Sequence, residues 1–220
     1  MFVYHEPMAP GVELPVEAPD LTATELHNEV AIRLFEVLRI VFGGRALVLH
    51  DIFLRVEESR QVAPDLLIVH GSTPGKRSVY RVPAEPVPDV TIEVLSPKND
   101  KPFGRRKLEE KRALLGAIGV PVHIELDPDR GLITIWHNVD RQLIAGDTTS
   151  RYDDHHLGGL HIELAPGEVA LRLPDGREYT DAAAEYTRAD RERQRADGER
   201  QRAERLAEAL RNAGIDPTSV

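Results

Sequence analysis

The segment PDVTIEVLSP, residues 88–97, is a run of β-branched residues that holds a carboxylate in its middle. Valine and isoleucine at this density, bounded by prolines, predict a strand that is buried on both faces. Glu93 stands between Ile92 and Val94, where an ionised side chain costs several kcal/mol unless a partner or a metal compensates it. We therefore expect this strand to lie in the centre of a sheet and to carry a functional acid.

A second acid opens the preceding strand. In PDLLIV, residues 64–69, Asp65 stands before a continuous apolar run. Side chains alternate along a strand, so Asp89 and Glu93 project from one face, although Asp89 follows a proline and has the alternative of being a turn residue. If the two strands are neighbours, Asp65 joins these groups at one edge of the sheet. Oxygen ligands of this kind are preferred by Mg²⁺ or Mn²⁺.

The remaining elements surround these strands. Hydrophobic spacing and turn residues predict, in order, a helix at 22–41, β-rich runs at 45–56, 61–71 and 86–97, a helix at 103–118, strands at 120–126 and 131–138, and a further strand pair before residue 180. The order helix, three strands, helix, strand predicts an α/β fold, an α+β mixed sheet with helices on both faces and extra β-hairpins.

The length of 220 residues suits one domain with an appendage. We predict an N-terminal extension at 1–21, the domain at 22–180, a charged helix at 181–213 and a C-terminal extension at 214–220. Apolar residues in the charged helix recur every seven positions, at Ala182, Ala189, Ala196, Ala203 and Leu210. This period is typical of a coiled coil, which would make a homodimer, and the alternative is a solvated single helix held by i,i+4 pairs.

The formal charge of −9, from 28 basic and 37 acidic residues, argues against a polyanionic partner when only the total is considered. The distribution changes this, because residues 98–112 carry seven basic and three acidic side chains directly after the acid-bearing strand. A basic segment there suits nucleic-acid phosphates, and its alternative role is an exposed helix face that aids solubility.

Several classes of protein are excluded by composition. The absence of cysteine excludes disulfides, thiolate metal sites and cysteine nucleophiles. The sequence shows neither a membrane span nor the order of residues that marks a signal peptide, so we expect a cytoplasmic protein without membrane contact.

These motifs together resemble the Uma-type putative restriction endonuclease family of the PD-(D/E)XK nuclease superfamily. The matching segments are PDLLIV at 64–69, PDVTIEVLSP at 88–97, EKRALL at 110–115, GVPVHIELDP at 119–128 and the tail ending LRNAGIDP at 210–217. The resemblance implies a restriction-endonuclease-like core and a divalent-metal phosphodiesterase site. Residue by residue, it implies that Glu25 is the acid of the first helix, Asp65 the PD acid and Glu93 the (D/E) acid, with Asp65 and Glu93 binding Mg²⁺ or Mn²⁺.

The lysine of the superfamily pattern has moved in this chain. Leu95 occupies the position two residues after Glu93, so the resemblance assigns the role to Lys111 on the following helix, with Lys107 as the substitute. An ammonium can serve the attacking water from a neighbouring element. Ser96 is a second-shell or phosphate-binding candidate whose alternative role is a turn cap, and Asp89 is a further second-shell candidate.

We thus expect a Mg²⁺-dependent endonuclease that hydrolyses DNA phosphodiester bonds. The alternative is a nuclease-like module without catalysis, which binds DNA or protein and dimerises through its C-terminal helix. Three departures favour this alternative: Leu95 stands where the superfamily pattern has a lysine, and Leu115 and the segment Val122-His123-Ile124 stand where the family commonly has aromatic residues. A two-carboxylate glycosidase ranks last, since only 5% of the residues are aromatic.

Overall fold

The computed structural model describes residues 25–180, except 58–59, 73–74 and 76, together with Arg193, Arg195, Arg200, Arg202 and Arg205. The predicted N-terminal extension, C-terminal extension and, apart from these arginines, the heptad helix lie outside the described residues. Their boundaries and the coiled-coil dimer therefore remain predictions.

A six-stranded mixed sheet with the order β1-β4-β6-β7-β8-β9 forms the centre of the described region. Its strands are β1 (Ala46–His50), β4 (Leu66–His70), β6 (Val90–Val94), β7 (Val122–Asp127), β8 (Leu132–Val139) and β9 (Gln142–Thr149). The central pair β6 and β7 is parallel, and the other neighbours are antiparallel. The strand predicted at 86–97 is therefore central, and all five residues of β6 are buried.

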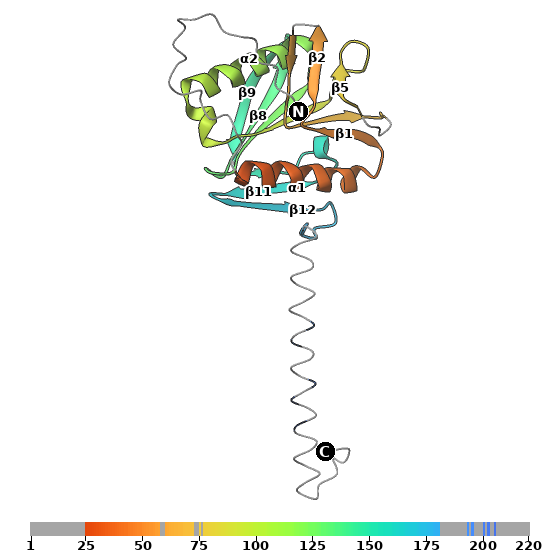
Figure 1. Ribbon diagram of the computed structural model, residues 1–220, viewed down its shortest axis with the longest axis vertical. Coiled ribbons are helices and arrows are strands. Elements are labelled where there is room, and N and C mark those ends of the chain that lie inside the picture. The colour runs from red at the N-terminus through yellow and green to blue at the C-terminus, as the bar shows by residue number, and fades with distance from the viewer. Residues whose placement is uncertain are drawn as a thin grey trace, which may run out of the picture.

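The two helices lie on opposite faces of this sheet (Figure 1). Helix α1 (Glu25–Phe42) buries a stripe that includes Val30, Leu34 and Leu38, and ends at two glycines, 43 and 44, with φ of +53° and +87°. Helix α2 (Pro102–Ile118) connects β6 to the parallel β7 and buries Leu115 against the other face. The predicted mixed sheet with a helix on each face is confirmed. Neither of these helices is both long enough and apolar enough to cross a membrane.

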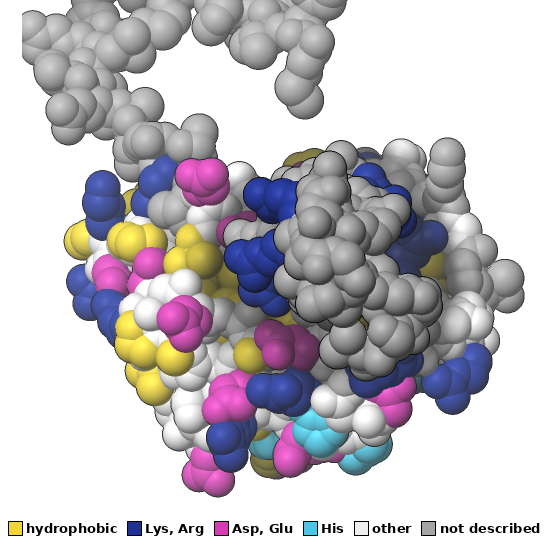
Figure 2. All heavy atoms as spheres, turned by 90° about the horizontal axis from the view of Figure 1, so that it is seen from below, with side chains coloured by type: hydrophobic (Ala, Val, Ile, Leu, Met, Phe, Trp, Pro, Cys, Tyr) yellow, Lys and Arg dark blue, Asp and Glu magenta, His cyan; other side chains and the backbone are white. Residues whose placement is uncertain are grey.

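Two small sheets extend the core. One has the order β3-β2-β5, with β2 (Phe53–Glu57), β3 (Arg60–Val62) and β5 (Val79–Arg81), and the other consists of β10 (Arg151–Tyr152), β11 (His161–Ala165) and β12 (Glu168–Arg172). Strands β11 and β12 lie beside α1 on its face of the central sheet (Figure 1). On the face of the molecule seen in Figure 2, acidic and basic side chains are interspersed.

Several details differ from the sequence prediction, and two of them concern the two ends of the central sheet. The β-rich run at 45–56 is divided between two sheets, because Asp51, with φ of +49°, turns the chain between β1 and β2. Strand β9 was not predicted, since most of its side chains are exposed and it lies at the edge of the sheet, where no apolar pattern is required.

Candidate active site

The strand register brings Asp65 and Glu93 together. Leu66 pairs with Ile92 across the antiparallel strands β4 and β6, so Asp65, which precedes β4, lies opposite Glu93. The backbone N–H of Val94 donates to Asp65 Oδ2 at 2.7 Å and fixes this carboxylate against the end of β6. The predicted adjacency of the two acids is present in the structure.

Lys111 reaches the same point from α2. Its ammonium contacts Glu93 Oε2 and donates a second hydrogen bond to the carbonyl of Ala63 at 2.8 Å. The side chains of Lys111 and Glu93 are only 15% and 9% exposed, so the ion pair is shielded from water. The lysine thus lies beside the acid of β6, although it belongs to the helix and not to position 95.

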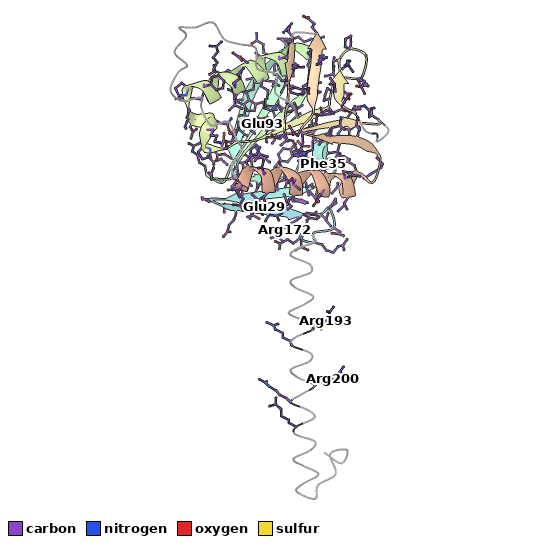
Figure 3. The ribbon with its side chains drawn as sticks, in the orientation of Figure 1. Glu29, Phe35, Glu93, Arg172, Arg193 and Arg200 are labelled. Carbon is purple, nitrogen blue, oxygen red and sulfur yellow. The ribbon has the colours of Figure 1, made fainter. Side chains whose placement is uncertain are left out.

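The charge of Glu93 depends on nearby cations. Burial raises the pKa of this carboxyl, the Lys111 ammonium opposes the increase, and the negative charge of Asp65 adds to it. The net shift of the Glu93 pKa is upward. A buried acid held between these opposing effects becomes fully ionised when additional positive charge approaches. Glu93 is therefore placed to respond to a bound cation. In Figure 3 it lies within the body of the protein, whereas Glu29 and Arg172 lie near the end formed by α1 and β12.

His27, which the sequence analysis did not select, joins the site from α1. Its Nδ1 donates to the carbonyl of Val94 at 2.6 Å, and its Nε2 lies 3.5 Å from Asp65 Oδ1. Burial lowers the pKa of His27, but the hydrogen bond and the charge of Asp65 outweigh it, and the net shift is upward. A usable signal was its position: His27 precedes Val30 and Leu34 on the buried stripe of the helix.

Glu25, expected to be the helix acid, is exposed and is not among the residues that line the cavity beside Asp65 and Glu93. Residues two apart on a helix project about 160° away from each other, so Glu25 and His27 cannot face the same point. The described structure does not bring Glu25 to the site, and its catalytic role remains a prediction.

A cavity of about 260 Å³ opens over these groups. Ser96 lies on its wall, at the start of the short helix η1 (Pro97–Asp100), and its backbone N–H and hydroxyl donate to Asn99 Oδ1 at 2.7 and 3.2 Å. Ser96 thus acts as a turn cap, the alternative considered for it. Lys107 also lines the cavity, with its side chain 61% exposed and its ammonium 3.5 Å from Glu110.

Asp89 has a structural role at the other end of β6. Its Oδ2 accepts a hydrogen bond from the backbone N–H of His70 at 2.7 Å, and its own N–H donates to the carbonyl of Ile68. These bonds close the end of the ladder between β4 and β6. Asp89 is not among the residues that line the cavity.

A second buried ion pair lies next to the first. Arg112, the residue after Lys111, donates to Glu125 Oε1 at 2.7 Å and stacks 4.3 Å from the centre of the Trp136 ring. The indole N–H of Trp136 donates to the other oxygen of Glu125 at 3.1 Å. Because Glu93 and Glu125 are paired in the register of β6 and β7, two consecutive cations of α2 contact two neighbouring strands.

His123 completes this second cluster. It is fully buried on β7, with Nδ1 2.9 Å from the hydroxyl of Thr91 and Nε2 3.5 Å from Glu125. Burial lowers the pKa of His123 below its usual value, and the contact with Glu125 only partly opposes this shift. Burial raises the pKa of Glu125, but the contacts with His123 and Arg112 lower it by more. The net shift is downward, which favours the ionised carboxylate. The cluster was not predicted from the sequence, although His123, Glu125 and Asp127 occupy alternate positions of one strand.

The donor set of the cavity fits a hard divalent cation. Asp65 and Glu93 supply carboxylate oxygens, and Mg²⁺ is usually held by one or two carboxylates together with water and substrate phosphate. The buried Glu93 carboxylate has one ammonium as its direct partner, so that a cation would relieve its desolvation. Within the described part of the chain, a tight three-ligand cluster occurs elsewhere, at Asp154, His155 and His156, where η2 (His155–Leu157) begins.

The comparison with protein families agrees with the motifs. The model of the Uma2 family, described as putative restriction endonuclease, matches residues 21–165. A search of curated proteins finds no match. Among solved structures, a putative nuclease belonging to DUF820 from Anabaena variabilis ATCC 29413 aligns with 64% of this chain and 79% of its own, at 15% identity and a TM-score of 0.48.

Proposed function

Because this chain belongs to the Uma2 family of putative restriction endonucleases, we propose that it is a divalent-metal-dependent endonuclease that hydrolyses DNA phosphodiester bonds. The observation that carries the proposal is the meeting of Asp65, Glu93 and Lys111 at one cavity. Two acids can hold a divalent metal, and a lysine beside them can stabilise developing negative charge, so together they support hydrolysis of a phosphodiester.

Asp65 and Glu93 would hold Mg²⁺ or Mn²⁺. Such an ion polarises a phosphoryl oxygen and lowers the pKa of its bound water. The hydrogen bond from Val94 N–H fixes Asp65 Oδ2, and His27 lies against Oδ1, so this carboxylate is held in one orientation. Preorganised ligands of this kind do not have to rearrange during the reaction.

Lys111 supplies the positive charge that the chemistry needs apart from the metal. Its ammonium would orient the attacking water or stabilise the negative charge that develops on the phosphate. The Ala63 carbonyl holds this ammonium beside Glu93, where it would take the role of a lysine at position 95. This placement weakens the alternative of an inactive module, because the missing lysine was a main argument for it.

The basic side chains of residues 98–112 would contact the DNA backbone. Lys98, Lys101 and Lys107 line the mouth of the cavity and carry charge that phosphates would neutralise. Such contacts are independent of base sequence and weaken with salt. The cytoplasmic location expected from the sequence remains a prediction.

The proposal is tested by cleavage of supercoiled plasmid with Mg²⁺, Mn²⁺ or EDTA. We expect nicking that requires the metal and falls by about 10²-fold or more in Glu93→Gln and Lys111→Met. Glu29→Gln, an exposed acid of α1, is the matched control and should cleave like the wild type. No nicking with either metal, or nicking that Glu93→Gln leaves unchanged, would sink the proposal and favour the inactive module.

Metal binding is measured separately by thermal melting. A ligand that binds only the folded state raises Tm, so Mn²⁺ should stabilise the wild type and Glu29→Gln but not an Asp65→Asn, Glu93→Gln double variant. An equal effect of Mn²⁺ on all three proteins would show that the ion binds elsewhere, for example at Asp154, His155 and His156.

A further inference from the structure

An exposed phenyl ring lies at the wall of the candidate active site. Phe103, in the first turn of α2, is 43% exposed and lines the cavity that contains Glu93. The Lys107 ammonium lies 5.6 Å from the centre of its ring. Burying a phenylalanine would stabilise the fold, and this ring stays in water beside a group of lysines. Its position therefore suggests a ligand that has both an apolar flat face and negative charge.

The backbone holds the lysines close to this ring. Gly104 allows η1 to pack directly on the first turn of α2, because a Cβ at this position would lie only 2.2 Å from the carbonyl oxygen of Lys98. Lys98 and Lys101 are thereby placed on the same wall as Phe103. An aromatic ring flanked by cations is the arrangement by which proteins bind single-stranded nucleic acid, with bases stacked on the ring and phosphates on the cations.

The burial of the two acids at the cavity favours an unpaired strand. The Asp65 and Glu93 side chains are 20% and 9% exposed, so a phosphate has to enter the recess to reach them. Bringing a stacked duplex so far in costs deformation energy, which a flexible single strand avoids.

We propose that Phe103 stacks on an unpaired base next to the phosphate that is presented to Glu93, and that the substrate is a single-stranded segment of DNA. This inference rests on the proposed function and specifies its substrate. Lys107 turns from the ring to the phosphate when the base stacks. A free strand, a gap, a displaced flap or a segment that negative supercoiling opens in a plasmid supplies the required nucleotide, and a relaxed, fully paired duplex does not.

Fluorescence anisotropy with labelled oligonucleotides tests the inference on the full chain. A single-stranded 20-mer and its blunt duplex are compared at one fixed salt concentration, because phosphate contacts depend on salt. EDTA is present throughout, so binding is measured without cleavage. We expect the single strand to bind at least about tenfold more tightly than the duplex, and Phe103→Ala to weaken single-strand binding by about tenfold, in line with the loss of one stacked base.

Two variants make the result specific. Phe103→Trp keeps a stacking surface and should restore single-strand binding to within about twofold of the wild type. Val139→Ala removes an exposed apolar side chain from β8 and should change neither affinity. Equal binding of single strand and duplex, or an affinity that Phe103→Ala leaves unchanged, would overturn the inference. If Phe103 governs binding but the plasmid assay shows no cleavage, the proposed function fails and the binding inference stands.

Discussion

Replacing Arg112 with methionine should destabilise the protein strongly, because it leaves a buried carboxylate without its cation. The Glu125 and Arg112 side chains are 6% and 19% exposed, and their ion pair has an N–O distance of 2.7 Å. Methionine keeps most of the contact with Trp136 and removes only the charge and the hydrogen bond. Breaking a buried pair in this way costs about 3–5 kcal/mol, and the indole N–H that Glu125 retains places this case near the lower value.

A loss of about 3 kcal/mol corresponds to a Tm lower by about 6–12 °C for a chain of this size. Urea unfolding gives the free energy directly. The protein has a single tryptophan, Trp136, and it lies under Arg112, so its fluorescence reports on this contact while circular dichroism reports on the whole fold. Coincident transitions from the two probes would justify a two-state fit.

The double variant Arg112→Met, Glu125→Met distinguishes a lost ion pair from lost packing. Removing both partners eliminates the unpaired charge, so most of the lost stability should return. Arg106→Met is the matched control on the same helix, since Arg106 pairs with Glu110 where both side chains are exposed. The reasoning is refuted if the free energy of unfolding of Arg112→Met lies within about 1 kcal/mol of the wild-type value, or if the double variant is no more stable than the single one.

Two further predictions concern the same half of the molecule. Burial lowers the pKa of His123 in the fold, and the charges of Lys111 and Arg112 lower it as well, against the opposing effect of Glu125. The unfolded chain therefore binds more protons below about pH 6.5, and the free energy of unfolding falls as the pH drops through that value, by at most about 1.4 kcal/mol per pH unit. His123→Gln should reduce this slope in urea titrations between pH 7.5 and about 5, and an unchanged slope would contradict the assignment. Gly104→Ala places a Cβ 2.2 Å from the Lys98 carbonyl, so η1 has to move, and thermal melts should show a loss of about 1–3 kcal/mol. An unchanged Tm would show that η1 yields without cost.

Side-chain alternation and strand composition were sufficient to predict the pair of acids. Asp65 and Glu93 both stand in apolar runs, and neighbouring strands with aligned ends bring such residues together. The position of Lys111 followed from the family resemblance. The acids and the lysine each stand in a short recognisable segment, and the order of the elements strongly restricts which strands can be neighbours.

His27 and Glu25 show where prediction from sequence fails. Both stand near the start of the same helix, and the choice between them depends on how the helix is rotated about its axis against the sheet. Packing against strands that are distant in the sequence sets this rotation, so a local motif cannot predict it. The pair of Arg112 and Glu125 was missed for a related reason, since its partners come from elements that are paired only in the folded structure.

The charged groups of the cavity come from four separate segments, and this has a consequence for folding. His27 lies 67 residues from Val94, Asp65 lies 29 residues from it, and Lys111 lies 18 residues from Glu93. Helix docking and strand pairing must both be complete before these groups meet. If the proposed nuclease is correct, a nascent or partly unfolded chain carries the individual charges but no cleavage centre, and the ability to cut DNA arises only with the last step of folding.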